Sequence, residues 1–242
     1  MNSRFLLLLV LIISSTVFFA GCNKEQDSST ATPAKATMSK TSQPQAEPVV
    51  IDPKLAAKGK DIYDQNCIFC HQPDAIGKPG FAPSLTNKEL LSVSSDKFLM
   101  GTIRDGRAGT GMPPFAHLGR SDVEAIVAFL RAHSHDQNKS ALVDAQPQSQ
   151  GDPRLGRFWF DQICSTCHGT NGDGYIAGGT GTAIGKAGFL DKASDGFIRE
   201  TIKYGRSNTR MLGFSGPEAM ANLSDSEIDD IIAYLRTVPS KS

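Results

Sequence analysis

Apolar side chains along this chain recur at the spacing of helices. Val123, Ile126, Val127 and Leu130 lie three or four positions apart, so they share one face of a helix. No stretch alternates apolar and polar residues for long enough to predict a sheet. The pattern therefore predicts an all-α protein.

The helical pattern occurs twice, because the chain contains an internal repeat. The matched segments are 59–71 with 156–168, 98–115 with 197–214, and 123–131 with 228–236. The second copy carries a short insertion between Phe214 and Leu223. An in-order match with few gaps predicts two copies of one fold.

Each copy is expected to contain three main helices, the first of which runs into a pair of cysteines. The second helix has a predicted N-cap and a predicted glycine stop in each copy: Ser95 and Gly106, then Ser194 and Gly205. The third helix opens on sequences that match a capping box, Ser121-x-x-Glu124 and Ser224-x-x-Glu227.

The polar and apolar segments predict five parts of the chain. These are a lipoprotein-type signal peptide at 1–21, a lipidated disordered tether at 22–50, a first domain at 51–135, a linker at 136–150 and a second domain at 151–239. The tether is rich in Ser, Thr, Ala, Gln, Pro and Lys and has no apolar periodicity, a composition typical of disorder.

The N-terminus predicts export and attachment to a membrane. Arg4 precedes the apolar run Phe5–Ala20, which is short for a membrane-spanning helix and suits a signal peptide. Phe19-Ala20-Gly21-Cys22 resembles a bacterial lipobox, so Cys22 is expected to carry lipid. Two alternatives are an ordinary signal peptide with a chance cysteine, and an uncleaved anchor. We expect a bacterial envelope protein, anchored to a membrane and facing the periplasm.

Charge and composition narrow the class of protein. The 242 residues carry 25 basic and 25 acidic side chains, and this balance argues against a nucleic-acid partner. Aromatic residues are few and glycines number 23, so the chain has few bulky apolar side chains with which to fill one large core. Small domains that gain apolar bulk from a cofactor fit this composition.

Two Cys-x-x-Cys-His motifs carry the clearest chemistry. They are Cys67, Cys70 and His71 in the first copy, and Cys164, Cys167 and His168 in the second. Two thiols three positions apart on a helical turn reach both vinyl groups of one haem, and the next His lies under the iron. We therefore expect two covalent haem c groups. The alternatives are a redox dithiol and a zinc site, but zinc ribbons place their cysteine pairs much closer together.

Methionines at matched positions are the expected second iron ligands. Met112 and Met211 each follow the Gly-Arg that ends the second helix, so each lies in a loop that can fold back over the haem. Thioether sulfur favours ferrous iron and raises the reduction potential. Met220, inside the insertion, remains an alternative to Met211. The other candidates, Met100, His117, His133 and His135, are better explained by packing or solvation.

With these motifs, residues 52–238 resemble a pair of class I cytochrome c domains. The resemblance implies that the carbonyl of Pro83 orients His71, whereas the second domain lacks this proline. It also matches Gly59 and Gly156 to the small residue at the crossing of the first and last helices. Arg107 and Arg206 suit haem propionates, since guanidinium binds carboxylates, or they are solvated loop residues.

The resemblance implies an electron-transfer protein and no catalytic residues. Two six-coordinate irons leave no vacant position for a substrate, so we expect a respiratory carrier rather than an enzyme. Its expected partners are a quinol-oxidising complex, a dehydrogenase or a haem–copper oxidase. The alternatives are a haem-bearing subunit of a larger oxidase or dehydrogenase complex, and a dihaem enzyme of the peroxidase or thiosulfate-oxidising type.

Overall fold

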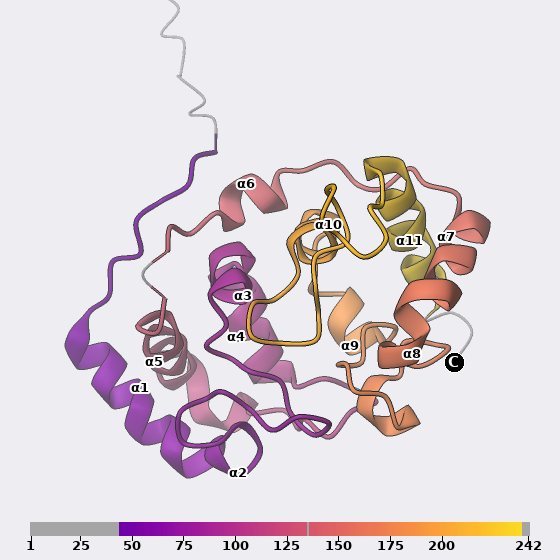
Figure 1. Ribbon diagram of the computed structural model, residues 1–242. Coiled ribbons are helices and arrows are strands. Elements are labelled where there is room, and N and C mark those ends of the chain that lie inside the picture. Colours follow the sequence, from indigo (N-terminus) through magenta and orange to yellow (C-terminus); the bar gives the residue numbers. More distant parts are fainter. Residues whose placement is uncertain (1–43, 135, 239–242) are drawn as a thin grey trace, which may run out of the picture. The chain divides into compact units, whose positions relative to one another are not determined.

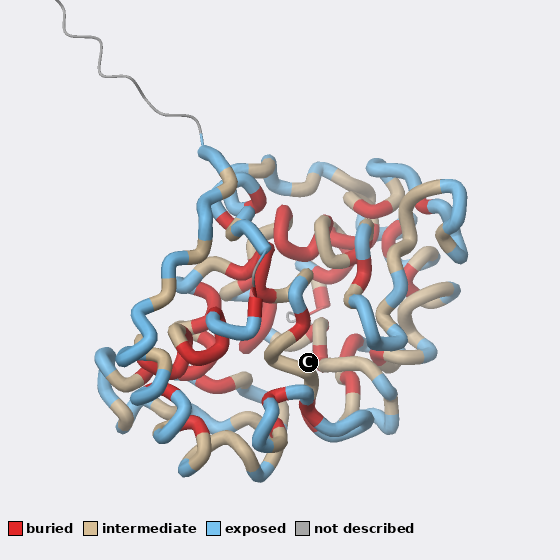
Figure 2. The backbone as a smooth tube through the Cα atoms, turned by 60° about the vertical axis from the view of Figure 1, so that its left-hand side comes forward, coloured by how far each residue is buried: buried red, intermediate tan, exposed pale blue. Residues whose placement is uncertain are grey.

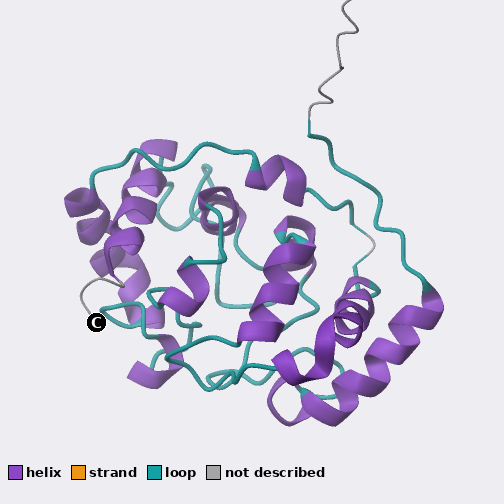
Figure 3. Cartoon of the chain, turned by 180° about the vertical axis from the view of Figure 1, so that it is seen from behind, coloured by secondary structure: helices purple, strands orange, loops and turns teal. Residues whose placement is uncertain are grey.

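A computed structural model describes residues 44–134 and 136–238, all within the compact unit Ser42–Ser242 (Figure 1). The predicted signal peptide, Cys22 and most of the predicted tether lie outside these residues. Every regular element in the described ranges is helical, and β-pairing is limited to two isolated bridges (Figure 3). The predicted all-α fold is confirmed. No helix of the described ranges is long and apolar enough to cross a membrane.

The first copy of the repeat folds around a pair of crossed helices. Its elements are α1 (Pro53–Asn66), α2 (Ile68–His71), α3 (Lys88–Val93), α4 (Asp96–Asp105), the 3₁₀ turn η1 (Ala116–Leu118) and α5 (Gly119–Arg131). Asp52 caps α1 by accepting a hydrogen bond from the Lys54 amide. Pro53 occupies the first turn, where a backbone N–H would have no partner within the helix, so the lack of one in proline costs no hydrogen bond. Helix α1 lies against α5 (Figure 1).

The second copy repeats this arrangement with one local change. Its elements are α7 (Pro153–Trp159), the π-helical turn η2 (Phe160–Cys164), α8 (Ser165–His168), the 3₁₀ turn η3 (Gly174–Ala177), α9 (Ala187–Leu190), α10 (Asp195–Tyr204) and α11 (Asp225–Thr237). Asp152 and Pro153 begin α7 as Asp52 and Pro53 begin α1. A π-helical turn leads into the second cysteine motif, a position where such turns often accompany functional sites.

Glycine lets the first and last helices of each copy cross at close range. A Cβ added to Gly59 would lie 1.8 Å from the carbonyl oxygen of Ala125 in α5. A Cβ added to Gly156 would lie 1.8 Å from the carbonyl oxygen of Asp230 in α11. Around these crossings the buried residues concentrate inside each helical cluster (Figure 2), including Tyr63 in the first and Phe160 in the second.

Most of the predicted helix ends are confirmed. Ser95 and Ser194 cap α4 and α10 by accepting from backbone amides, and Gly106 and Gly205 end those helices. Ser224 forms the predicted capping box with Glu227.

The capping box expected at Ser121 is wrong. The 3₁₀ turn η1 runs directly into α5, so this helix begins at Gly119 with Leu118 at the N-cap position and no side-chain cap. Ser121 therefore lies inside the first turn.

The predicted linker and the end of the predicted tether are more ordered than their composition suggests. Residues 136–150 contain α6 (Ser140–Asp144), whose Val143 is only 2% exposed and which packs against α10. Glu47 pairs with Asn138 through two backbone hydrogen bonds of 2.9 and 2.8 Å, so the tether is attached at this point. Contacts between distant segments override the polar composition here.

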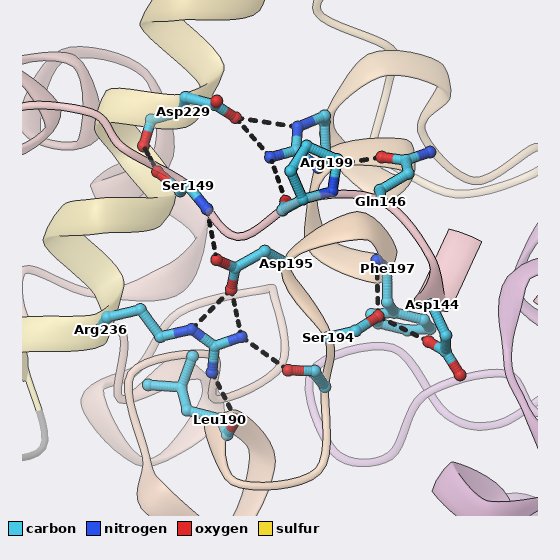
Figure 4. A network of polar contacts seen from close by, with 12 residues as sticks. Asp144, Gln146, Ser149, Leu190, Ser194, Asp195, Phe197, Arg199, Asp229 and Arg236 are labelled. Carbon is cyan, nitrogen blue, oxygen red and sulfur yellow. Dashed lines mark hydrogen bonds and ion pairs between the residues drawn. The ribbon is translucent and has the colours of Figure 1, made fainter. Parts of the chain in front are cut away.

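A repeated arginine clamp holds the last helix of each copy to the start of the preceding long helix. Arg131 of α5, only 4% exposed, binds Asp96 at 2.7 Å and the Ser94 carbonyl at 2.6 Å. Arg236 of α11 binds Asp195 at 2.5 Å and the Ala193 carbonyl at 2.7 Å (Figure 4). These arginines serve the fold.

A second polar cluster joins the linker to the second copy. Arg199 of α10 donates to Asp229 at 2.8 Å and to the Gln146 side chain at 2.9 Å (Figure 4). Ser149 donates through its backbone N–H to Asp195 at 2.7 Å and through its hydroxyl to the Asp229 carbonyl at 2.6 Å. The linker is thus held to α10 and α11.

Candidate functional site

The first cysteine motif is built at the junction of α1 and α2. Cys67 ends α1, and the single turn α2 carries Cys70 and His71, so both sulfurs and the imidazole lie on consecutive helical turns. His71 is 8% exposed, and its Nδ1 lies 3.0 Å from the carbonyl oxygen of Pro83. This is the contact that the resemblance implied for Pro83. It fixes the ring and leaves Nε2 available for a metal.

The second motif has the same arrangement but a different carbonyl partner. His168, 9% exposed, places Nδ1 2.8 Å from the carbonyl oxygen of Thr182. The glycine-rich loop of residues 178–188 carries this carbonyl under the ring, since the Gly181 amide donates to the Cys167 carbonyl at 2.7 Å. A Cβ on Gly181 would lie 2.7 Å from the imidazole, so only glycine fits there. The second domain lacks the proline, and no pattern in the sequence marks Thr182 as the residue that replaces it.

No disulfide joins the four cysteines of the two motifs, and the first cysteine of each motif is a poor candidate for thiolate chemistry. Burial of the Cys67 thiol, and to a smaller extent its electrostatic interaction with Cys70, raises the pKa of Cys67 to about 11. Burial of the Cys164 thiol, and to a smaller extent its electrostatic interaction with Cys167, raises the pKa of Cys164 to about 12. Reactive dithiols have lowered pKa values instead, so the redox-dithiol alternative loses support. Among the residues that the structure describes, no cluster of three or more His, Cys, Asp and Glu residues suits a metal such as zinc.

Both imidazoles are held in the neutral form that ligates metals. Burial lowers the pKa of His71, and the nearby positive charge of Arg107 lowers it further, against the Pro83 hydrogen bond. Burial also lowers the pKa of His168, against the hydrogen bond to Thr182. Neutral imidazole at physiological pH keeps a ring nitrogen lone pair free for iron.

The two methionine loops share one backbone geometry. The Arg107 amide donates to the Met112 carbonyl at 3.0 Å, and the Arg206 amide donates to the Met211 carbonyl at 2.6 Å. In each loop the methionine amide donates in turn to a threonine hydroxyl two residues earlier, at 3.2 Å in the first copy and 3.0 Å in the second. Both loops therefore fold back on the end of the preceding helix in the same way.

The alternative ligand Met220 lies apart from this geometry. Its side chain is 79% exposed, whereas Met112 and Met211 are partly buried. Met211 lines the same cavity as Cys164, Cys167 and His168, and Met220 does not. Met211, and not Met220, therefore shares a cavity with the second cysteine motif.

A cavity of about 1480 Å³ lies between the second cysteine motif and the long helices α4 and α10, and the ligand candidates of the first copy, Cys67, Cys70, His71 and Met112, do not line it. Its lining includes His168 and Met211 of the second copy, and Pro83, Leu99 and Arg107 of the first. It exceeds the roughly 300–1,000 Å³ typical of pockets for one small ligand. Thiols, an imidazole and a thioether around an apolar space are the donor set that covalent haem requires. A smaller cavity of about 510 Å³ beside Val49 contains none of these groups.

Comparison with known families identifies both copies. Residues 54–130 match the family "Cytochrome C oxidase, cbb3-type, subunit III", and residues 154–239 match the family "Cytochrome c". The chain therefore consists of two tandem cytochrome c domains, of the kind that carries covalently attached haem.

Curated relatives point to one kind of respiratory protein. The chain is 29% identical to the cbb3-type cytochrome c oxidase subunit CcoP of Rubrivivax gelatinosus, over 83% of this chain and 60% of that protein. It is 43% identical to the cbb3-type cytochrome c oxidase subunit FixP of Bradyrhizobium sp. (strain ORS 278), over 64% of this chain and 55% of that protein. The chain spans about three fifths of the length of these relatives.

Among solved structures, the chain resembles one from a reducing HAO-like protein complex of Kuenenia stuttgartiensis. The TM-score is 0.47 at 18% identity, covering 78% of this chain and 99% of that one.

Proposed function

We propose that this chain is a haem-bearing electron-transfer subunit of a haem–copper oxidase complex. Support comes from the match of the first domain to a cbb3-type oxidase subunit family and from relatives that bear the same description. Of the interpretations drawn from the sequence, these findings favour the complex subunit over the independent shuttle. The chain itself transfers electrons and leaves oxygen chemistry to its partner.

The observation that carries this proposal is the repeated ligand geometry. Each domain presents a buried His whose Nδ1 faces a carbonyl oxygen, at 3.0 Å for His71 and 2.8 Å for His168. Each also presents a methionine in the same folded-back loop. Covalent haem c supplies an iron that changes oxidation state by one electron. A His and a Met in each domain would both ligate the iron of a bound haem, and this would leave no position for a substrate.

The residues then have separate tasks. Cys67, Cys70, Cys164 and Cys167 would attach the two haems, and His71 and His168 would ligate their irons. Pro83 and Thr182 orient those imidazoles through their carbonyl oxygens. Met112 and Met211 complete the coordination and favour the ferrous state. The fold keeps the surroundings of each iron constant in both oxidation states, which suits fast electron exchange.

Ligand substitution tests the assignment of the methionines. Methionine-ligated ferric haem has a weak red charge-transfer band, and Met112→Ala and Met211→Ala are each expected to remove about half of it. Met220→Ala is the matched control and is expected to leave the band intact, since its side chain is 79% exposed. The spectra of the three purified variants provide the measurement.

Two results would contradict this assignment. Loss of the band in Met220→Ala but not in Met211→Ala would place the ligand in the insertion. Rapid cyanide or peroxide binding by the unmodified protein would show an open iron and favour the enzyme alternative.

We also propose that the chain is held at a membrane by lipid on Cys22, facing the periplasm. The lipobox-like sequence Phe19-Ala20-Gly21-Cys22 supports this. Cys22→Ser is expected to release folded haem protein into the soluble periplasmic fraction, measured by haem staining of cell fractions. Unchanged retention would mean that an uncleaved helix or another anchor holds the protein.

Co-purification tests the partner. A mild detergent extract is expected to yield the chain together with subunits that contain haem and copper. Isolation of the chain without such subunits, while it remains reducible by a respiratory donor, would favour the independent shuttle.

A further inference from the structure

Helix α7 of the second domain carries apolar side chains on its solvent side. Leu155 is 53% exposed and Phe158 is 55% exposed, and Trp159, the single tryptophan of the chain, is partly buried. The rings of Phe158 and Trp159 meet edge to face with centroids 5.1 Å apart. Positions i, i+3 and i+4 of a helix share one face, so these three residues form an apolar strip, which we call the α7 face.

The internal repeat shows that the fold does not require apolar residues on this face. The alignment of the two copies places Lys58 of α1 at the position of Leu155, and Asp61 at the position of Phe158. Both residues of α1 are exposed, and Lys58 pairs with Asp122 of α5 at 2.6 Å. Helix α1 thus crosses its partner helix with charged residues on its outer side. Adjacent exposed apolar residues that the fold does not require indicate contact with another surface.

The α7 face lies outside the cavity of the second cysteine motif. Phe160, Ile163 and Cys164, which follow α7 in the chain, line that cavity, whereas the three residues of the α7 face do not. A haem in the cavity would therefore leave the α7 face exposed. The other side of α7 packs on α11 at Gly156 (Figure 1).

Two arginines border the α7 face, and each forms an ion pair with a nearby carboxylate. Arg154 binds Asp152 at 2.9 Å, and Arg157 binds Asp161 at 2.6 Å. Leu, Phe and Trp on one face of a helix, with arginine beside them, are typical of helices that lie in the interface between water and lipid. Because both arginines are paired, the attraction to such an interface has to come from the apolar side chains.

Size argues against a second copy of the chain as the occupant of the α7 face. Stable protein interfaces bury about 800 Å² on each partner, and three partly exposed side chains supply only a fraction of that area. Insertion of a few apolar side chains into lipid needs no such area when a tether keeps the chain close to the lipid surface.

The proposed lipid on Cys22 would supply such a tether. Residues 23–43 separate Cys22 from the first described residue and span about 70 Å when fully extended. This length exceeds the roughly 40 Å diameter of a compact unit of about 200 residues. The α7 face is therefore within reach of the lipid surface that holds Cys22.

We propose that the α7 face inserts into the lipid surface to which the chain is attached, so that the second domain lies against the membrane. This inference goes beyond the proposed function, since it depends on the outer face of one helix and not on the haem. An inserted α7 would hold the second domain in one orientation, whereas a tether alone leaves the chain free to rotate.

Vesicle binding tests the proposal on the full-length Cys22→Ser protein with both haems. Leu155→Lys and Phe158→Asp, combined in one variant, introduce the residues that α1 carries, so the fold is expected to accept them and the net charge does not change. Sedimentation with phosphatidylcholine vesicles, followed by haem absorbance, measures binding. We expect the double variant to bind at least about tenfold more weakly than its Cys22→Ser parent, because two apolar side chains can no longer insert.

Trp159 provides a second measurement on the membrane-attached protein with Cys22 intact. Brominated lipid is expected to quench its fluorescence, because Trp159 belongs to the α7 face and insertion brings it to the acyl chains. The same two substitutions are expected to relieve this quenching. The result does not depend on which segment anchors the chain.

Tyr204→Asp is the matched control. Tyr204 is 68% exposed on α10, and Asp105 occupies the equivalent position of the first copy. This variant also replaces an exposed aromatic residue by its counterpart in the repeat, and it is expected to bind vesicles as the parent does. Binding is further expected to persist at high salt, since salt screens charges and does not weaken apolar insertion.

Several outcomes would overturn the inference. These are no vesicle binding by the parent, release of the parent by salt, or equal Trp159 quenching with and without the two substitutions. A dimer that the double variant dissociates would assign the α7 face to a second copy. Loss of haem–copper subunits from a detergent extract of the double variant would assign it to a protein partner.

The proposed function is tested separately by the haems. Two haems and an intact methionine charge-transfer band in the parent and the double variant would leave the proposed function standing, whatever the vesicles show. Loss of a haem or of the band from the unmodified protein would refute the proposed function and would leave the vesicle result unaffected.

Discussion

The hydroxyl of Ser224 closes the first turn of α11. It accepts from the Glu227 amide at 3.3 Å, while the Glu227 carboxylate accepts from the Ser224 amide at 2.8 Å. This reciprocal pair satisfies two amides that the helix itself cannot satisfy. The Ser224 amide, and next the Ser224 hydroxyl, which donates to this carboxylate at 2.7 Å, hold the pKa of Glu227 below its ordinary value. A single side chain thus secures the beginning of the helix that crosses α7.

Ser224→Ala is expected to lower the free energy of unfolding by about 1 kcal/mol, the usual effect of losing an N-cap. Ser121→Ala is the matched control, since Ser121 lies inside the first turn of α5 and caps nothing. Guanidinium denaturation of the haem-loaded protein, followed by circular dichroism, measures both. Equal destabilisation by the two substitutions would contradict the assigned cap.

At the scale of helices, the crossing of α1 with α5 and of α7 with α11 organises each domain. Gly59 and Gly156 bring the backbones so close that a methyl group at either position meets a carbonyl oxygen at 1.8 Å. Main-chain atoms cannot move aside as a flexible side chain can. The crossing geometry therefore depends on the absence of a side chain at one position in each pair.

Gly59→Ala and Gly156→Ala are each expected to destabilise the protein by about 2–3 kcal/mol, because overpacking forces the helices apart. Gly101→Ala is the control within another helix. A Cβ there lies 3.7 Å from the flexible Lys192 side chain, so we expect unchanged or increased stability, by about 0.5–1 kcal/mol. Thermal unfolding of the three variants gives the comparison, and tolerance of alanine at Gly156 would show that α7 and α11 can separate.

At the scale of the whole molecule, each domain has its own helix crossing and its own cysteine motif. The stacking of Phe98 on Phe197 joins the domains, and buried residues of both, including Tyr63 and Phe160, belong to one continuous apolar cluster. We propose that the domain boundaries follow the two helix crossings, with 51–135 and 151–239 as the units. The ordered linker contacts both units, because α6 packs on α10 and on α3.

A fragment covering residues 51–136 is expected to mature with one covalent haem. It keeps α1, α5 and the complete first motif, while it exposes Phe98, on which Phe197 stacks in the intact chain. Haem content by mass spectrometry and helicity by circular dichroism are the measurements. Failure to fold, when the intact chain matures normally in the same cells, would mean that the two domains depend on one another for a stable core.

Features set by residues close together in the chain could be predicted from the sequence. The cysteine and histidine of each motif are neighbours, so one helical turn brings them together wherever it lies. Ser95, Ser194 and Ser224 cap helices through amides only three positions away. Because the two copies match, each such prediction could be made for both domains, and only the capping box predicted at Ser121 was wrong.

Other features depend on segments that only the folded chain brings together. The Thr182 carbonyl reaches His168 because the glycine-rich loop passes under the ring, and no local pattern marks that oxygen. The start of α5 is set by the turn that precedes it, which overrode the capping pattern at Ser121. The stacking of Phe98 on Phe197 arises from the docking of two domains. Short-range geometry follows from covalent neighbours, whereas these contacts follow from long-range packing, which no local pattern encodes.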